Sequence, residues 1–250
     1  MAIPDMPAQP SLRPAILTLA FRPFFLAGSP WAAIAIGLWT AMMAGWLVLP
    51  SRFGPLAWHM HEMLFGWIFT ALAGFLLTAI PNWTGRAPVR GVALGALVIL
   101  WVLGRLACLV SAIVPLWMAA TVDVAFPVTL FLVAAHEIVA ARNWRNLAMP
   151  VPVAVLALAD LLTYRQLAGL AVAGPGWRLA IAATAILISV IGARIIPAFT
   201  RNWLTGHGAK SLSAASDTLD RIAAATLHAG LFAWAAVLAY ARRAFSCSWP

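Results

Sequence analysis

The chain has 250 residues, of which 64% are hydrophobic and only 9% are charged, and its mean hydropathy is +0.93. This composition excludes a water-soluble globule, because a chain of this length could not bury so much apolar surface. The net charge of +9 comes from basic residues scattered singly between apolar runs, which argues against a nucleic-acid-binding face. We therefore expect an all-α, polytopic transmembrane helix bundle whose partner is the lipid bilayer.

Seven apolar runs are long enough to cross a hydrocarbon layer as helices. They lie within a predicted transmembrane domain over residues 23–241, between an irregular N-terminal arm (1–22) and a short tail (242–250). Proline is expected to end the second run at Pro81, because it cannot continue a hydrogen-bonded helix. The predicted spans are about 31–49, 59–80, 91–110, 115–139, 147–163, 177–196 and 219–240.

The distribution of basic residues predicts the orientation of these spans. With the N-terminus in the cytoplasm, ten of the sixteen Lys and Arg residues lie on the cytoplasmic side, as the positive-inside rule favours. The pair Arg242–Arg243 disagrees, because an odd number of spans puts it outside. We expect a cytoplasmic N-terminal arm.

Chemistry is most concentrated in the stretch WHMHEMLFG, over residues 58–66. His59, His61, Glu62 and Met63 lie in the first turn of the second span, directly before a run without charges. Ionisable groups inside a membrane are costly to keep, so a His-Glu cluster at this position predicts a functional site. Imidazole and thioether ligands suit haem iron or copper.

His59 and His61 are about 200° apart around a regular helix, so one metal ion cannot bind both from it. Either the two rings serve different partners or the helix begins after them. Each ring is also consistent with an interface residue that is only hydrogen bonded. Glu62 is a candidate to orient a ligand or transfer a proton, or it is a solvated acid at a helix start.

Other polar residues interrupt the apolar runs. His136 and Glu137 end the fourth span, where a boundary salt bridge with Arg142 is the simpler interpretation. His228 stands in the middle of the seventh span and is a further candidate ligand, although a hydrogen bond to a neighbouring helix would also explain it. His207, in a polar loop, is expected to be solvated.

Two further features are interpreted as structural. Asp123 and Arg105 lie at similar depths on the antiparallel third and fourth spans, so we expect them to form an ion pair. Cys108 lies near the outer end of the third span, at the depth of the histidines, where its thiol is a candidate ligand, although an apolar filler is the simpler interpretation. Its distance from Cys247 in the sequence predicts no disulfide.

Four long strings, FRPFFL, WHMHEMLFG, AGFLLTAIPNWTG and IGARIIPAFTRNWL, resemble those of the NnrS family of membrane proteins. They are spread over residues 21–204 and mix charged, aromatic and glycine residues in a fixed order. The resemblance implies a protein of the bacterial inner membrane that holds haem and copper and helps cells withstand nitric oxide, often beside denitrification functions.

Carried over by position, the family's histidine-rich motif falls on His59, His61 and Glu62, which become the first candidates for cofactor contacts. His136 and His228 are further candidates for cofactor contacts, and the candidate metal ligands are His59, His61 and Met63. The resemblance does not fix which histidine binds which metal. Family members have more spans than are expected here, so the resemblance implies that the ending RRAFSCSWP is a C-terminal truncation.

Two classes of function follow. The first is a haem and copper protein that binds nitric oxide or relieves its toxicity. Whether it is an enzyme stays open, because we find no nucleophile constellation and no phosphate-binding glycine loop. The alternative is a proton or small-solute transporter or channel subunit whose path is lined by intramembrane carboxylates, namely Glu62, Asp123, Glu137 and Asp160.

Overall fold

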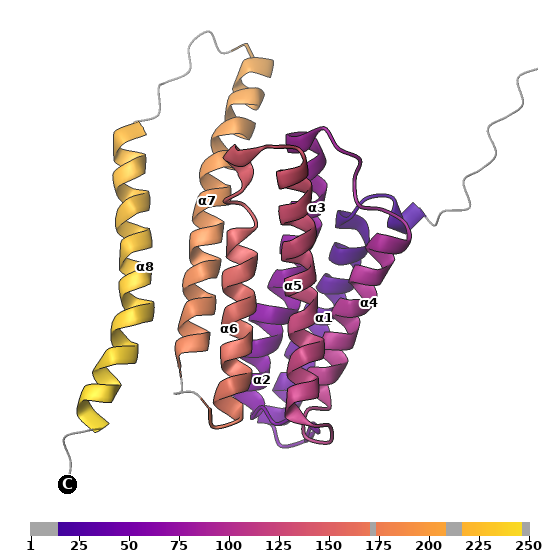
Figure 1. Cartoon of the computed structure of the whole chain (residues 1–250), viewed down its shortest axis with the longest axis vertical. Coiled ribbons are helices and arrows are strands. Elements are labelled where there is room, and N and C mark those ends of the chain that lie inside the picture. The colour runs from indigo at the N-terminus through magenta and orange to yellow at the C-terminus, as the bar shows by residue number, and fades with distance from the viewer. Residues whose placement is uncertain (1–14, 171–173, 209–216, 247–250) are drawn as a thin grey trace, which may run out of the picture.

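Helices make up nearly all of the computed structural model, which describes residues 15–170, 174–208 and 217–246. They run side by side with long axes roughly aligned (Figure 1). Their bounds are η1 Ala15–Leu17, α1 Phe21–Met43, α2 Pro55–His61, η2 Glu62–Trp67, α3 Ile68–Thr84, α4 Val92–Leu109, α5 Leu116–Ala140, η3 Trp144–Asn146, α6 Val151–Leu167, α7 Pro175–Gly206 and α8 Asp217–Ser246.

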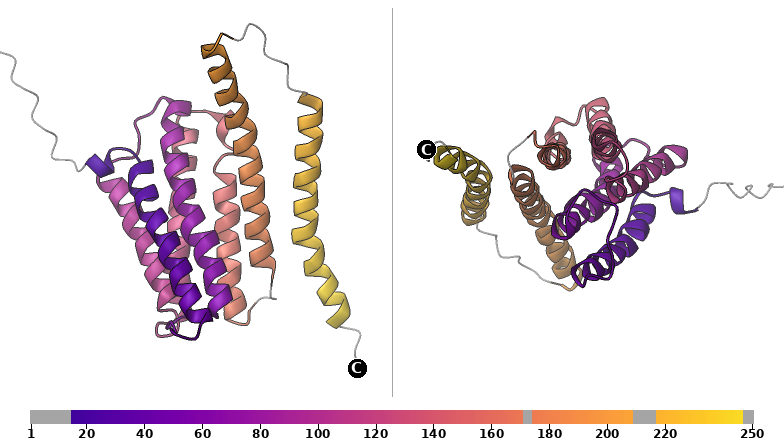
Figure 2. Two further views of the ribbon diagram at one scale, coloured as in Figure 1. Left: turned by 180° about the vertical axis from the view of Figure 1, so that it is seen from behind. Right: turned by 90° about the horizontal axis from the view of Figure 1, so that it is seen from below.

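The predicted all-α polytopic bundle is confirmed. Six helical segments in the described ranges are long and apolar enough to cross a membrane: 21–43, 55–84, 92–109, 116–140, 144–167 and 175–206. The seventh predicted span falls on α8, whose described apolar stretch, Ile222–Ala236, is shorter. Helix α8 lies at the edge of the bundle beside α7, as both views in Figure 2 show.

The first predicted span is displaced along the chain. Helix α1 begins at Phe21, and Pro30 lies inside it, where we expected the chain to enter the helix. The helix ends at Met43 because Gly45 has a positive φ of 75°, a conformation that glycine adopts without strain. The apolar residues 46–49 therefore belong to a loop, and the part of the predicted arm at residues 1–14 lies outside the described residues.

The second span is longer than predicted at both ends. Helices α2, η2 and α3 form one continuous segment of 30 residues, which starts at Pro55 in the first turn and ends before Gly85. Pro81 lies inside α3, so its expected role as the stop was wrong. A proline in the last turn removes only one backbone hydrogen bond, and the left-handed Gly85 (φ 68°) ends the helix instead.

The middle part of this segment, η2, is π-helical. One turn of π-helix widens the backbone ring and shifts the side chains that follow it around the axis. Its six residues begin immediately after His61. The irregularity therefore falls within the motif that carries the predicted chemistry.

Aromatic side chains fill the centre of the bundle between α1, α3 and α5. Phe24, Phe69 and Phe126 are buried, with ring centroids 5.8 Å apart for Phe24 and Phe126 and 6.1 Å for Phe69 and Phe126. A second cluster of buried apolar residues, including Phe53, Trp58 and Tyr164, lies around the end of the bundle where α2 begins and α4 ends. The polar residues described next lie at that end.

Candidate metal centre

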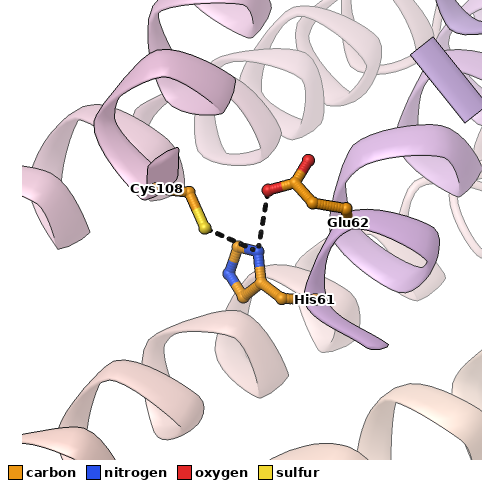
Figure 3. A group of neighbouring side chains, drawn as sticks. All are labelled: His61, Glu62 and Cys108. Carbon is orange, nitrogen blue, oxygen red and sulfur yellow. Dashed lines mark hydrogen bonds and ion pairs between the residues drawn. The ribbon is translucent and has the colours of Figure 1, made fainter. Parts of the chain in front are cut away.

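His61 lies fully buried at the junction of α2 and η2, and partners approach both nitrogens of its ring. Nδ1 is 3.4 Å from Cys108 Sγ and 3.5 Å from Glu62 Oε1. Figure 3 shows the thiol, which comes from α4, and the carboxylate converging on this nitrogen. On the other side of the ring, Nε2 is 3.0 Å from Asp160 Oδ1 and 3.4 Å from Asp123 Oδ2.

Arg105 links two of these carboxylates. Its guanidinium donates from one nitrogen to Glu62 Oε2 over 3.0 Å and from the other to Asp123 Oδ1. The predicted pairing of Arg105 with Asp123 is confirmed, but the pair belongs to the His61 cluster and is more than a local structural contact. Two further donors complete the network: Trp31 Nε1–H donates to Glu62 Oε2 (2.8 Å), and the Tyr164 hydroxyl donates to Asp123 Oδ2 (2.8 Å).

Close helix packing depends on two glycines beside this network. A β-carbon at Gly66 would lie 2.9 Å from Glu62 Oε2, 3.0 Å from an Arg105 nitrogen and 3.1 Å from Trp31 Nε1. A β-carbon at Gly104 would lie 2.8 Å from Asp123 Oδ1 and 3.2 Å from its Cα. Glycine thus lets α4, α5 and the π-helical turn approach closely enough for the charged groups to meet.

Aromatic rings enclose the imidazole of His61. The ring centroids of Phe53, Phe65, Tyr164 and Trp177 lie 4.6, 5.1, 5.5 and 6.4 Å from the His61 centroid. Water is therefore excluded from the faces of the ring. The site has a low dielectric, in which an unbalanced charge is costly.

The buried charges of the described residues are all in this cluster, and they do not balance. Three carboxylates, Glu62, Asp123 and Asp160, outnumber the single guanidinium of Arg105 by two negative charges when His61 is neutral. Glu62 Oε1 and Asp160 Oδ2 are buried without a hydrogen-bond partner. A divalent cation would supply the missing charge.

The distances in the cluster also suit a metal ion. Two trios of potential ligand atoms each lie within 4.8 Å of one another: His61, Glu62 and Cys108, and His61, Asp123 and Asp160. A tetrahedral ion with bonds of about 2.0–2.3 Å separates its ligand atoms by about 3.3–3.8 Å. The distances of 3.4 and 3.5 Å from Nδ1 to the thiol and the carboxylate fall in this range.

The predicted site residues other than His61 and Glu62 lie elsewhere. His59 stacks on Trp39, with centroids 4.1 Å apart, and its Nδ1 is buried without a partner. Its side chain and that of His61 leave the helix in different directions, as the spacing predicted. Met63 packs in the apolar cluster at the same end of the bundle.

His136 lies near the opposite end of the bundle from His61. Its neighbour Glu137 pairs with Arg86, which precedes the first turn of α4, whereas Cys108 of the His61 cluster lies in the last turn of α4. The predicted boundary salt bridge exists, but its cation is Arg86 and not Arg142. Glu137 raises the pKa of the Arg86 guanidinium above its ordinary value by accepting its hydrogen bond. His228 is half-buried on α8, its Nε2 without a partner, and His207 is exposed and stacked on Trp203.

Sequence reasoning placed Cys108 at the depth of the histidines but favoured an apolar filler there, and it missed Tyr164 and Trp31 as members of the site. A signal was present for Cys108, because it lies three residues after Arg105 and therefore on the same face of a helix. Tyr164 likewise follows Asp160 by four residues. A polar residue within one turn of an intramembrane charge thus points to the buried face.

No curated protein and no solved structure matches the chain. The family model described as NnrS protein matches residues 15–248, which include every helix described above. The helices long enough to span a membrane and the family match agree with each other. The chain belongs to the NnrS family.

Proposed function

We propose that this protein holds a metal ion at His61 and a haem elsewhere in the bundle, and that it helps a bacterial cell withstand nitric oxide. The proposal includes an inner-membrane location with the N-terminus in the cytoplasm. The single observation that carries it is the fully buried His61 cluster, in which the carboxylates exceed the guanidinium by two charges. Family membership supports the choice of haem and copper.

Copper is the ion that best suits the Nδ1 side of His61. Cys108, His61 and Glu62 offer one sulfur, one nitrogen and one oxygen atom, and a thiolate with an imidazole selects copper or zinc over magnesium or calcium. Arg105 and Trp31 donate to the other oxygen of Glu62 and leave Oε1 for the ion. Bound copper would supply one-electron exchange and a position for a small ligand such as nitric oxide.

Haem does not fit at His61, because the four surrounding rings leave no slot for a porphyrin next to the imidazole. The groove between α4 and α5 suits it better. This groove has a volume of about 540 Å³ and is lined by apolar side chains, among them Ala93, Ala96 and Leu132, and by the exposed His136. A helical side chain leans toward the N-terminus of its helix, which directs His136 over Leu132 and into the groove.

The surroundings of His136 resemble those of a ligating histidine. Its Nδ1 faces Glu137 Oε1 at 3.4 Å, and Arg86 holds that carboxylate. A carboxylate on one ring nitrogen commonly orients the other nitrogen toward a metal. Arg86 and Arg90 lie before α4 at the same end of the groove and are suited to pair with haem propionates. His59 and His228 are the further candidates for haem.

The test is the visible spectrum and metal content of the purified full chain, with a pyridine haemochrome assay. We expect His61→Ala to lose copper and keep the Soret band, and His136→Ala to lose the Soret band and keep copper. His207→Ala is the matched control, because that ring is exposed and stacked on Trp203, and it should change neither signal. Cells lacking the protein should grow more slowly under nitric oxide.

Transport is the second candidate function. Three of the four carboxylates proposed to line a path meet at His61, whereas Glu137 lies at the opposite end of the bundle. A colourless, metal-free preparation that takes up neither haem nor copper would favour transport over the metal centre.

A further inference from the structure

His61 presents ligand atoms on both sides of its ring, and the proposed copper ion uses only the Nδ1 side. On the Nε2 side, Asp160 Oδ1 lies at 3.0 Å and Asp123 Oδ2 at 3.4 Å. The two sides come from different helices, since Cys108 belongs to α4 and the two aspartates to α5 and α6. A single imidazole therefore separates two sets of potential ligands.

Asp160 is the least compensated charge of the cluster. Its side chain is 0% exposed, Oδ1 faces only His61, and Oδ2 is buried without a hydrogen-bond partner. Arg105 bonds to Glu62 and Asp123 but not to Asp160. A buried carboxylate without a cation is strongly unfavourable.

One divalent copper ion does not neutralise the negative charge of the His61 cluster. Cys108 binds a metal as a thiolate, which adds a negative charge to the two that are already uncompensated. A single divalent ion then leaves one negative charge, and Asp160 is the group without a cation. If His61 bridges two ions as an imidazolate, two divalent cations neutralise the cluster completely.

We propose that Asp123, Asp160 and the Nε2 atom of His61 bind a second divalent cation, so that the imidazole of His61 bridges two metal ions of different character. The Nδ1 side, with its sulfur, is soft. The Nε2 side offers two carboxylates and one imidazole, a set that suits manganese, iron or zinc. Tyr164 donates to Asp123 Oδ2 and fixes that carboxylate beside the ring. This inference deepens the proposed function, because it places the copper site and the second site on one histidine.

The experiment uses the full chain in detergent, stripped of metal and reloaded with copper, and Mn²⁺ as the probe of the second site. Binding of Mn²⁺ weakens the six-line electron paramagnetic resonance signal of the free ion, so the bound fraction can be counted. We expect the copper-loaded wild type to bind one Mn²⁺ per chain. We also expect the Cu²⁺ signal to change when Mn²⁺ binds, because an imidazolate couples the two ions.

Three variants separate the two sites. Asp160→Asn keeps the shape of the side chain and should keep copper. Loss of a residue that only supports a ligand weakens metal binding about 10–100-fold, and we expect Asp160→Asn to weaken Mn²⁺ binding by more than that. Cys108→Ser should lose copper and keep Mn²⁺, and His61→Ala should lose both. Circular dichroism of each variant checks that the helices form.

Two results would overturn the second site. The first is that copper-loaded wild type binds no Mn²⁺. The second is that Asp160→Asn lowers copper affinity while Mn²⁺ binding is unchanged, which would make Asp160 a residue that only positions His61. A wild type that binds Mn²⁺ but no copper would refute the proposed function and leave the second site standing.

Discussion

Replacing Arg105 by glutamine should destabilise the protein far more than replacing Arg86 by glutamine. Arg105 is 4% exposed and bonds to two carboxylates, Glu62 and Asp123, that are 0% and 1% exposed. Removing one partner of a buried ion pair costs about 3–5 kcal/mol, because the remaining charge is left in a medium of low dielectric. Arg86 pairs with Glu137 at the bundle boundary and is 41% exposed, so water screens that pair and breaking it should cost little.

Thermal unfolding in detergent, followed by tryptophan fluorescence, measures the difference. A change of 1 kcal/mol shifts Tm by about 2–4 °C in a chain of 150–250 residues. We therefore expect a loss of about 6–20 °C for Arg105→Gln and little or no loss for Arg86→Gln. Equal losses in the two variants would refute the view that the Arg105 network is buried and charged.

Two further predictions concern the helices around the site. Gly28→Ala should lower stability by about 1–3 kcal/mol, because the new β-carbon would lie 2.0 Å from Thr70 Oγ1 on α3. Gly37→Ala, on the same helix but with nothing within 4 Å, should be neutral or stabilising, and thermal unfolding of the pair compares them. Trp31→Phe should remove the hydrogen bond to Glu62 Oε2 and cost about 1.5–3 kcal/mol in the same assay, with weaker copper binding by equilibrium dialysis. Unchanged copper affinity would mean that Trp31 does not position Glu62.

The sequence alone predicts the helices of the bundle well and their ends poorly. Long apolar runs identify spanning helices because the hydrocarbon thickness sets their length. The ends depend on single backbone conformations, such as the positive φ of Gly45 and Gly85, and proline proved a poor marker at Pro30 and Pro81. Pro81 lies in the last turn of α3, where a proline removes too little hydrogen bonding to stop the helix, whereas Pro30 lies well inside α1 and does not end it.

The centre of the site was predictable, but its composition was not. His61 and Glu62 stand out because ionisable groups at membrane depth are costly to keep and therefore indicate a functional site. Their partners Arg105, Cys108 and Asp160 lie 43 to 99 residues away along the chain, and only helix packing brings them together. A single sequence indicates which residues share a helix face, but not which faces meet.

The π-helical turn is a second feature that sequence patterns did not reveal. It follows His61 without any proline or unusual composition to mark it. Gly66 within this turn allows the close approach of Glu62, Arg105 and Trp31. The geometry of the candidate site therefore depends on a backbone irregularity that arises from packing.

X-ray absorption at the copper edge of the purified, copper-loaded protein tests the central claim most directly, namely that the buried His61 cluster holds a metal ion. The ligand set predicts a sulfur neighbour together with nitrogen or oxygen neighbours in the first shell of the wild type, and no such copper shell in Cys108→Ser, which should lose the ion. A first shell without sulfur in the wild type, or one unchanged by the substitution, would contradict the assignment of copper to this cluster.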